Sequence, residues 1–137
     1  MGAILSLVLI VTAVVSWNMV PASIDPELQG YVDNFYADAK RYGVEAEEIN
    51  YAGFFDHLPD NTVGIGMYPN ILIATEERGS ITLESLVYHE LAHAVMGCSH
   101  SGDPKSIMYD TNTIYAANNW DSVVESFFTK EYKELCQ

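Results

Sequence analysis

The stretch His89-Glu90-Leu91-Ala92-His93 lies inside an apolar segment that runs from Leu83 to Gly97. Two histidines four residues apart on a helix lie on the same face, one turn above the other. A single tetrahedral metal ion can therefore take one nitrogen from each imidazole. The glutamate that follows the first histidine is placed to act as general base on a water molecule held by such an ion.

A third histidine completes the ligand set that a catalytic zinc ion needs. Such a site uses three protein ligands and keeps a fourth position open for water. The sequence has four histidines, and His100 follows the helix, whereas His57 lies in a polar loop where we expect it in solvent. We predict one catalytic Zn²⁺ whose ligands are His89, His93 and His100. Glu90 is the predicted catalytic residue.

The balance of charges describes an acidic protein. Its 137 residues include 6 Lys and Arg against 19 Asp and Glu, so the formal net charge is −13, and 49% of the residues are apolar. This length and apolar share suffice for one domain with a real core. Because such a surface repels phosphate groups, we expect no nucleic-acid partner and no attraction to anionic lipid. A monomer is expected.

The first 24 residues carry no charged side chain, and residues 3–15 are almost entirely Ala, Ile, Leu and Val. This run is short for a membrane span and matches the core of a signal peptide. Cleavage after Ala22 would divide the chain into a leader, 1–22, and a single catalytic domain, 23–137. An uncleaved membrane anchor that extends through Trp17 is the alternative. Either way we expect a secreted or otherwise extracytoplasmic domain.

Cys98 and Cys136 are the only cysteines in the sequence. In an oxidising compartment they could form a disulfide from just past the central helix to the C-terminus, worth about 3–4 kcal/mol by chain entropy. Two free thiols are the equally open alternative, because pairing does not follow from two positions. Cys98 is not expected as a metal ligand, since His100 fills that place.

The pattern before the motif predicts one helix and three strands. Asp25 as N-cap and Pro26 at the first position begin a helix that Gly43 ends. Its apolar stripe is Leu28, Val32, Phe35, Ala39 and Tyr42. A short strand is expected over 49–54, and a buried strand over 71–74.

The remaining strand, Thr62 to Tyr68, alternates apolar residues with Gly64 and Gly66. Glycines inside a strand often indicate close approach of another backbone. After the strands, Ser80 or Thr82 is expected to cap the central helix.

The chain after the central helix is predicted to be irregular from Ser99 to Asn119. A last helix follows with Asp121 as its cap. The apolar stripe of that helix is Val123, Val124, Phe127, Phe128 and Leu135.

The motif and the sequence Ser106-Ile107-Met108-Tyr109 together resemble the metzincin zinc peptidases, most nearly the matrixins. That family follows His-Glu-x-x-His-x-x-Gly-x-x-His with a tight turn that carries a methionine beneath the zinc. Met108 matches this Met-turn methionine. Gly97 and His100 each stand one residue further along than the family pattern has them.

The resemblance implies a zincin-like α+β fold and a zinc-dependent endopeptidase. The fold would have a small twisted mixed sheet with an antiparallel edge strand, packed on an N-terminal helix and a central active-site helix. The Met-turn and a C-terminal helix would follow. The strand 62–68 would be the edge strand that binds a protein or peptide substrate in extended form. Glu90 would act as general base on the zinc-held water.

Two other interpretations fit the same residues. A gluzincin-like hydrolase would take its third ligand from a helix glutamate such as Glu125. A non-catalytic binding module would use the metal only for stability. Glu90 argues against the module, because structural zinc sites are usually closed by four protein ligands and need no carboxylate beside an open position.

Overall fold

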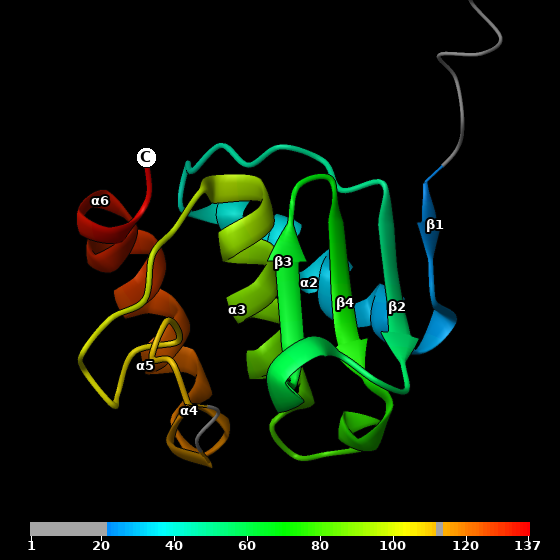
Figure 1. Cartoon of the computed structure of the whole chain (residues 1–137). Coiled ribbons are helices and arrows are strands. Elements are labelled where there is room, and N and C mark those ends of the chain that lie inside the picture. Colours follow the sequence, from blue (N-terminus) through cyan, green and yellow to red (C-terminus); the bar gives the residue numbers. More distant parts are fainter. Residues whose placement is uncertain (1–21, 112–113) are drawn as a thin grey trace, which may run out of the picture.

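The computed structural model describes residues 22–111 and 114–137 (Figure 1). The proposed leader, apart from Ala22, lies outside these residues. Within the two ranges, no helix has the length and apolar character needed to cross a membrane.

The first helix, α2 (Pro26–Arg41), forms as its caps predict. The Asp25 side chain accepts a hydrogen bond from the Glu27 N–H at 2.9 Å, and Gly43 follows the helix with φ of 70°. The predicted apolar stripe is buried at Leu28, Val32, Phe35 and Ala39 and half-buried at Tyr42. The stripe packs α2 against the rest of the core.

A four-stranded mixed sheet has the order β1-β2-β4-β3. Its strands are β1 (Ser23–Ile24), β2 (Tyr51–Phe55), β3 (Gly64–Met67) and β4 (Asn70–Ala74). β1, β2 and β4 run parallel, whereas β3 pairs antiparallel with β4 only. The predicted mixed sheet with an antiparallel edge strand is confirmed. The two-residue β1 was not predicted, because its pairing with β2 is nonlocal.

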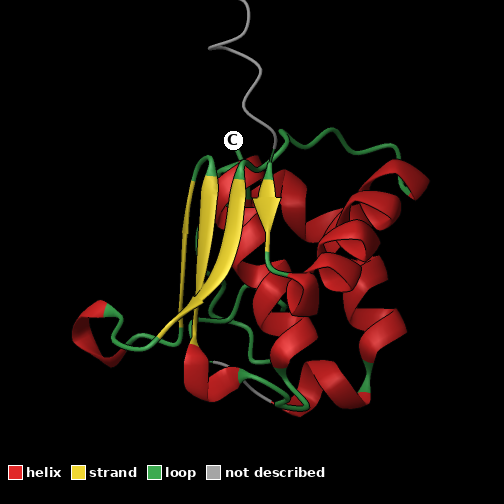
Figure 2. Cartoon of the chain, turned by 90° about the vertical axis from the view of Figure 1, so that its right-hand side faces the viewer, coloured by secondary structure: helices red, strands yellow, loops and turns green. Residues whose placement is uncertain are grey.

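The central helix, α3 (Leu83–Met96), packs against β3, β4 and α2. Thr82 occupies the N-cap position without a side-chain cap bond, and Gly97 ends the helix in the left-handed conformation with φ of 64°. Figure 2 shows the strands on one side of the molecule and the long helices on the other. The helix bearing the motif therefore lies directly against the edge strand.

The chain after α3 is more helical than predicted. Its helices are α4 (Ile114–Asn118), α5 (Trp120–Ser126), the π-helical turn η3 (Phe127–Glu131) and α6 (Tyr132–Leu135). Short 3-10 turns, η1 (Pro59–Asn61) and η2 (Thr75–Glu77), precede α3.

Two boundaries in this part were predicted wrongly. α4 lies inside the stretch expected to be irregular. Asn119, not Asp121, is the N-cap of α5, because the Val123 N–H donates to the Asn119 carbonyl at 3.0 Å and starts the helix earlier. The predicted stripe is nevertheless buried at Val123, Val124, Phe127 and Phe128. The α+β fold is confirmed.

Candidate metal centre

The Nε2 atoms of three histidines lie close together beside α3. The His93 Nε2 lies 3.0 Å from the His89 Nε2 and 3.0 Å from the His100 Nε2, and the remaining pair is 3.2 Å apart. Nitrogens about 2.0–2.1 Å from a shared tetrahedral ion lie about 3.3 Å from one another. The cluster could therefore hold a metal ion, and among the described residues it is the one cluster of such side chains.

Main-chain carbonyls fix the orientation of the two helix histidines. His89 Nδ1 lies 2.8 Å from the Ile107 carbonyl oxygen, and His93 Nδ1 lies 2.6 Å from the Cys98 carbonyl oxygen. Because a carbonyl only accepts, each Nδ1 carries the hydrogen, and each neutral ring presents a lone pair at Nε2. This is the arrangement in which imidazoles bind metals.

Burial keeps these rings neutral. It lowers the pKa of His89 to about 4, against the smaller opposing effect of the Ile107 carbonyl. Burial also lowers the pKa of His93. At neutral pH two lone pairs therefore face each other across 3.0 Å, and a cation between them would convert that repulsion into binding. The donor set thus fits a metal ion.

Glu90 is buried beneath the edge strand, with only 5% of its surface exposed. Burial raises the pKa of its carboxyl group to about 7, whereas the hydrogen bond from the Gly66 N–H lowers it. Its side chain lines the same cavity as the three histidines. A carboxyl group with such a pKa can both accept and release a proton near neutral pH.

The two strand glycines allow β3 to approach α3 closely, as predicted. A Cβ atom at Gly66 would overlap the main-chain carbonyl of Glu90. A Cβ atom at Gly64 would lie 2.7 Å from the Glu90 Oε1. Side chains at these positions would therefore displace either the strand or the carboxylate.

The free edge of β3 borders the cavity. The Val63 carbonyl accepts from the Ala74 N–H at 2.8 Å and so points toward β4. Because main-chain groups alternate in direction along an antiparallel strand, those of Gly64 and Gly66 point to the opposite edge. No strand in the described ranges pairs with that edge.

A cavity of about 920 Å³ joins these features. Its lining comes from β3 and the residues just before it, from α3 and the three histidines, and from the segment 106–111. The space is large enough for several side chains of an extended peptide.

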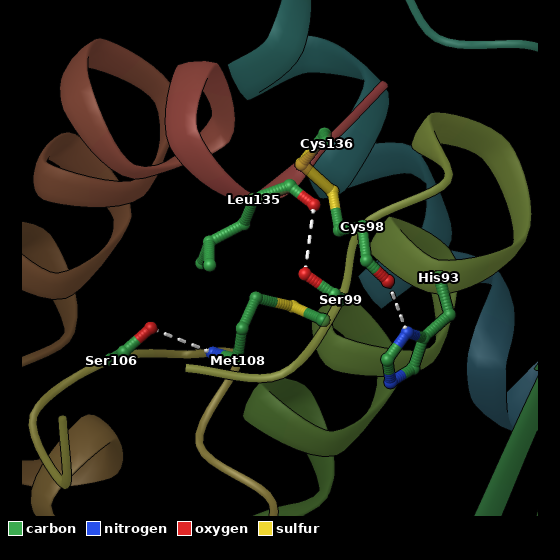
Figure 3. Close-up of a disulfide and its surroundings, with 7 residues drawn as sticks. All are labelled: His93, Cys98, Ser99, Ser106, Met108, Leu135 and Cys136. Atoms are coloured by element: carbon green, nitrogen blue, oxygen red, sulfur yellow. Dashed lines mark hydrogen bonds between the residues drawn. A yellow bond between two sulfur atoms is a disulfide. The ribbon is translucent and has the colours of Figure 1, made fainter. Parts of the chain in front are cut away.

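The turn at Ser106–Tyr109 lies beside the histidine cluster and contributes to the cavity lining. The Met108 N–H donates to the Ser106 Oγ at 3.0 Å, and the Tyr109 N–H donates to the Ser106 carbonyl at 3.2 Å. Met108 is fully buried, and Figure 3 shows its sulfur end pointing toward the segment that begins at Cys98. The turn also supplies the Ile107 carbonyl that orients His89.

Cys98 and Cys136 form a disulfide (Figure 3). Of the two alternatives that the sequence left open, the structure contains the bonded one. The bridge joins the end of α3 to the C-terminus of the chain. The carbonyl of the same Cys98 is the hydrogen-bond partner of His93.

Two candidates from the sequence lie outside the cluster. His57 is exposed in the loop after β2, and Glu125 is exposed on α5. Neither belongs to the group of side chains close enough to share an ion. The sequence did not predict that the carbonyl groups of Cys98 and Ile107 orient the histidines. Every residue has a carbonyl group, and only the folded structure shows which of them contact the rings.

No protein-family model matches this chain, and no curated protein or solved structure matches it.

Proposed function

We propose that this protein is a zinc-dependent endopeptidase of the metzincin type, resembling the matrixins. The observation that carries the proposal is the convergence of three histidine nitrogens beside a buried glutamate, under the free edge of a strand. A structural metal site would need a fourth protein ligand and no adjacent carboxylate. His89, His93 and His100 would hold one zinc ion.

The proposed reaction divides the chemistry between the ion and Glu90. When bound, zinc supplies Lewis acidity, which lowers the pKa of water to about 7 and polarises the peptide carbonyl. Glu90 takes the proton from the attacking water and returns it to the departing amine. The carbonyls of Ile107 and Cys98 keep the ligand rings in the metal-binding tautomer.

The substrate would bind as an extended strand antiparallel to β3. Main-chain hydrogen bonds to an exposed strand edge are a common mode of peptide binding. The main-chain groups of Gly64 and Gly66 point to that edge, and the Gly66 N–H is already used by Glu90. The cavity beyond His89 would receive a substrate side chain between α3 and residues 106–111.

We also propose that the domain is exported from the cytoplasm. A signal peptide cleaved after Ala22 would release residues 23–137, and an uncleaved segment would anchor them outside the cytoplasm. The disulfide suits an oxidising compartment. The acidic charge leaves proteins or peptides, rather than nucleic acids, as the partner class, and we propose a monomer.

Cleavage of an unfolded protein tests the proposal. The zinc-loaded chain, exported to an oxidising compartment and purified, is incubated with carboxymethylated casein. We expect cleavage that a chelator abolishes and that Glu90→Gln lacks while retaining its zinc. Glu90→Gln is a matched control, because its amide oxygen can still accept from the Gly66 N–H. Equal cleavage by Glu90→Gln would contradict the assigned general base.

A further inference from the structure

We propose that the Cys98–Cys136 disulfide positions the metal ligands, so that the C-terminus of the chain is part of the support of the metal site. This inference rests on the proposed metal site, but not on any peptidase activity. It assigns to the disulfide a role in metal affinity beyond its contribution to folding stability.

Cys98 serves two purposes at one position. Its sulfur is bonded to Cys136, and its carbonyl oxygen lies 2.6 Å from the Nδ1 of His93 (Figure 3). Its own N–H donates to the Ala92 carbonyl at 3.1 Å, which completes the turn after α3. Because the sulfur holds the residue in place, the carbonyl stays directed at the His93 ring.

The next residue extends the same attachment toward the third ligand. The Ser99 N–H donates to the Leu135 carbonyl at 2.8 Å, and the Ser99 Oγ donates to the same oxygen at 3.2 Å. These bonds accompany a short antiparallel bridge between Cys98 and Cys136. His100 follows directly.

A second attachment lies on the other side of His100. The Ser101 N–H donates to the Met108 carbonyl at 2.8 Å. His100 is thus held between the C-terminus and the turn at residues 106–109. The C-terminal attachment is the last turn of the continuous helical run α5–η3–α6. The disulfide bonds the residue after this turn to the segment that carries His100.

His100 needs this support more than the other two ligands do. It is exposed and follows the helix rather than lying in it. If the segment from Gly97 to Ser101 were loose, metal binding would have to order it, and that entropy would weaken the affinity. Loss of groups that orient metal ligands typically lowers metal affinity by about 10–100-fold.

Zinc affinity of the full, oxidised chain tests the inference. Competition against a chromophoric chelator gives the dissociation constant, and the absorption spectrum of the Co²⁺-loaded protein reports the ligand geometry. The test variant is Cys98→Ser/Cys136→Ser, which removes the bridge and leaves no thiol to bind metal. The control is Leu28→Ala, which loses core packing in α2, and Leu28 is not among the residues that line the metal-site cavity.

We expect the double variant to bind zinc about 10–100-fold more weakly than the wild type, with an altered Co²⁺ spectrum. Leu28→Ala should keep the wild-type affinity despite a lower melting temperature. Unchanged affinity in the double variant, or an equal loss in Leu28→Ala, would overturn the positioning role. A wild type that binds no zinc would instead contradict the proposed function.

Discussion

The two histidines on α3 and the histidine after it are held in place by different means. His89 and His93 lie in a 14-residue helix whose own hydrogen bonds fix their spacing. His100 lies beyond the end of that helix, and its position depends on contacts with the C-terminus and with the turn at residues 106–109. Local periodicity places the first pair, whereas a cross-link between distant parts of the chain places the third ligand.

This difference has a consequence for both the site and its sequence signature. The helix pair is available as soon as α3 forms, so it can be recognised from spacing alone. The spacing of the third position is not fixed by the helix, because attachments on both sides of His100 set its place. The one-residue displacement of Gly97 and His100 relative to the metzincin pattern is compatible with this arrangement.

The largest expected effect comes from removing a helix ligand. His93→Ala should lower zinc affinity by far more than 100-fold, because it removes a ring whose tautomer and orientation are already fixed. His100→Ala should cost less, since an exposed ligand contributes less net binding free energy than a buried one. Zinc titration of both variants measures the comparison. A larger loss in His100→Ala would reverse the proposed ranking of the two regions.

Removing the disulfide should destabilise the segment around His100 more than the middle of α3. The disulfide joins residues separated by 38 positions in the sequence. Closing a loop of this length stabilises the fold by about 4 kcal/mol through the lower chain entropy of the unfolded state. We expect Cys98→Ser/Cys136→Ser to lower the zinc-free free energy of unfolding by about that amount, measured in urea. Amide exchange should rise most strongly at residues 97–101 and least in the middle of α3. An equal increase of amide exchange at residues 97–101 and in α3 would contradict this difference, because it would mean that the two regions open together.

The two glycines of β3 face different parts of Glu90: Gly66 faces its main-chain carbonyl and Gly64 faces its side chain. Gly66→Ala should destabilise the fold by about 1–3 kcal/mol, because the added methyl group meets the main-chain carbonyl of Glu90. Gly64→Ala meets the Glu90 side chain rather than the main chain, so the fold should suffer less. Proteolytic turnover should instead fall by about 100-fold as the carboxylate moves. Urea unfolding measures the stability of the two variants, and casein cleavage measures their activity. Equal losses of stability in Gly64→Ala and Gly66→Ala would contradict the expected difference.

The smallest effect is expected at Tyr36, which lies outside both ligand regions. Its hydroxyl donates to the Glu47 carbonyl at 2.7 Å and accepts from the Ile49 N–H at 3.0 Å. Burial, opposed by the bond from Ile49 and reinforced by nearby acidic groups, raises the pKa of Tyr36 to about 12 from its ordinary value of 10. Because the folded-state pKa is the higher one, this stabilisation is complete below pH 10 and is lost as the pH rises to 12.

Unfolding in urea between pH 9 and pH 12 checks this window. The wild type should lose stability more steeply than Tyr36→Phe above pH 10, although Tyr88, whose pKa burial also raises, keeps some slope in both. Tyr36→Phe should leave zinc affinity at neutral pH unchanged. Parallel pH curves for the two proteins would contradict the assignment.

The parts of the fold that the sequence predicted are those governed by local rules. Caps and 3.6-residue periodicity predicted α2, and the spacing of His89 and His93 in an apolar segment predicted α3. Alternation with glycines predicted β3 as a strand close to another backbone. The three histidines and Glu90 were predicted from type and spacing, and the structure brings these four side chains to one cavity.

The parts that were missed depend on contacts between distant residues. β1 has two residues and exists only through its pairing with β2. Asn119 rather than Asp121 is the N-cap of α5; both residue types cap helices, so the sequence alone did not decide between them. The pairing of Cys98 with Cys136 and the carbonyl partners of the histidines likewise follow only from the folded chain.

The number and kind of atoms around bound zinc test the central proposal most directly. X-ray absorption at the zinc edge of the loaded, oxidised protein should show three imidazole nitrogens at about 2.0–2.1 Å and one further oxygen. His100→Ala should lose one imidazole from that shell, and Glu90→Gln should lose none. A shell of four protein ligands, a sulfur ligand, or no stoichiometric zinc would contradict a three-histidine catalytic site.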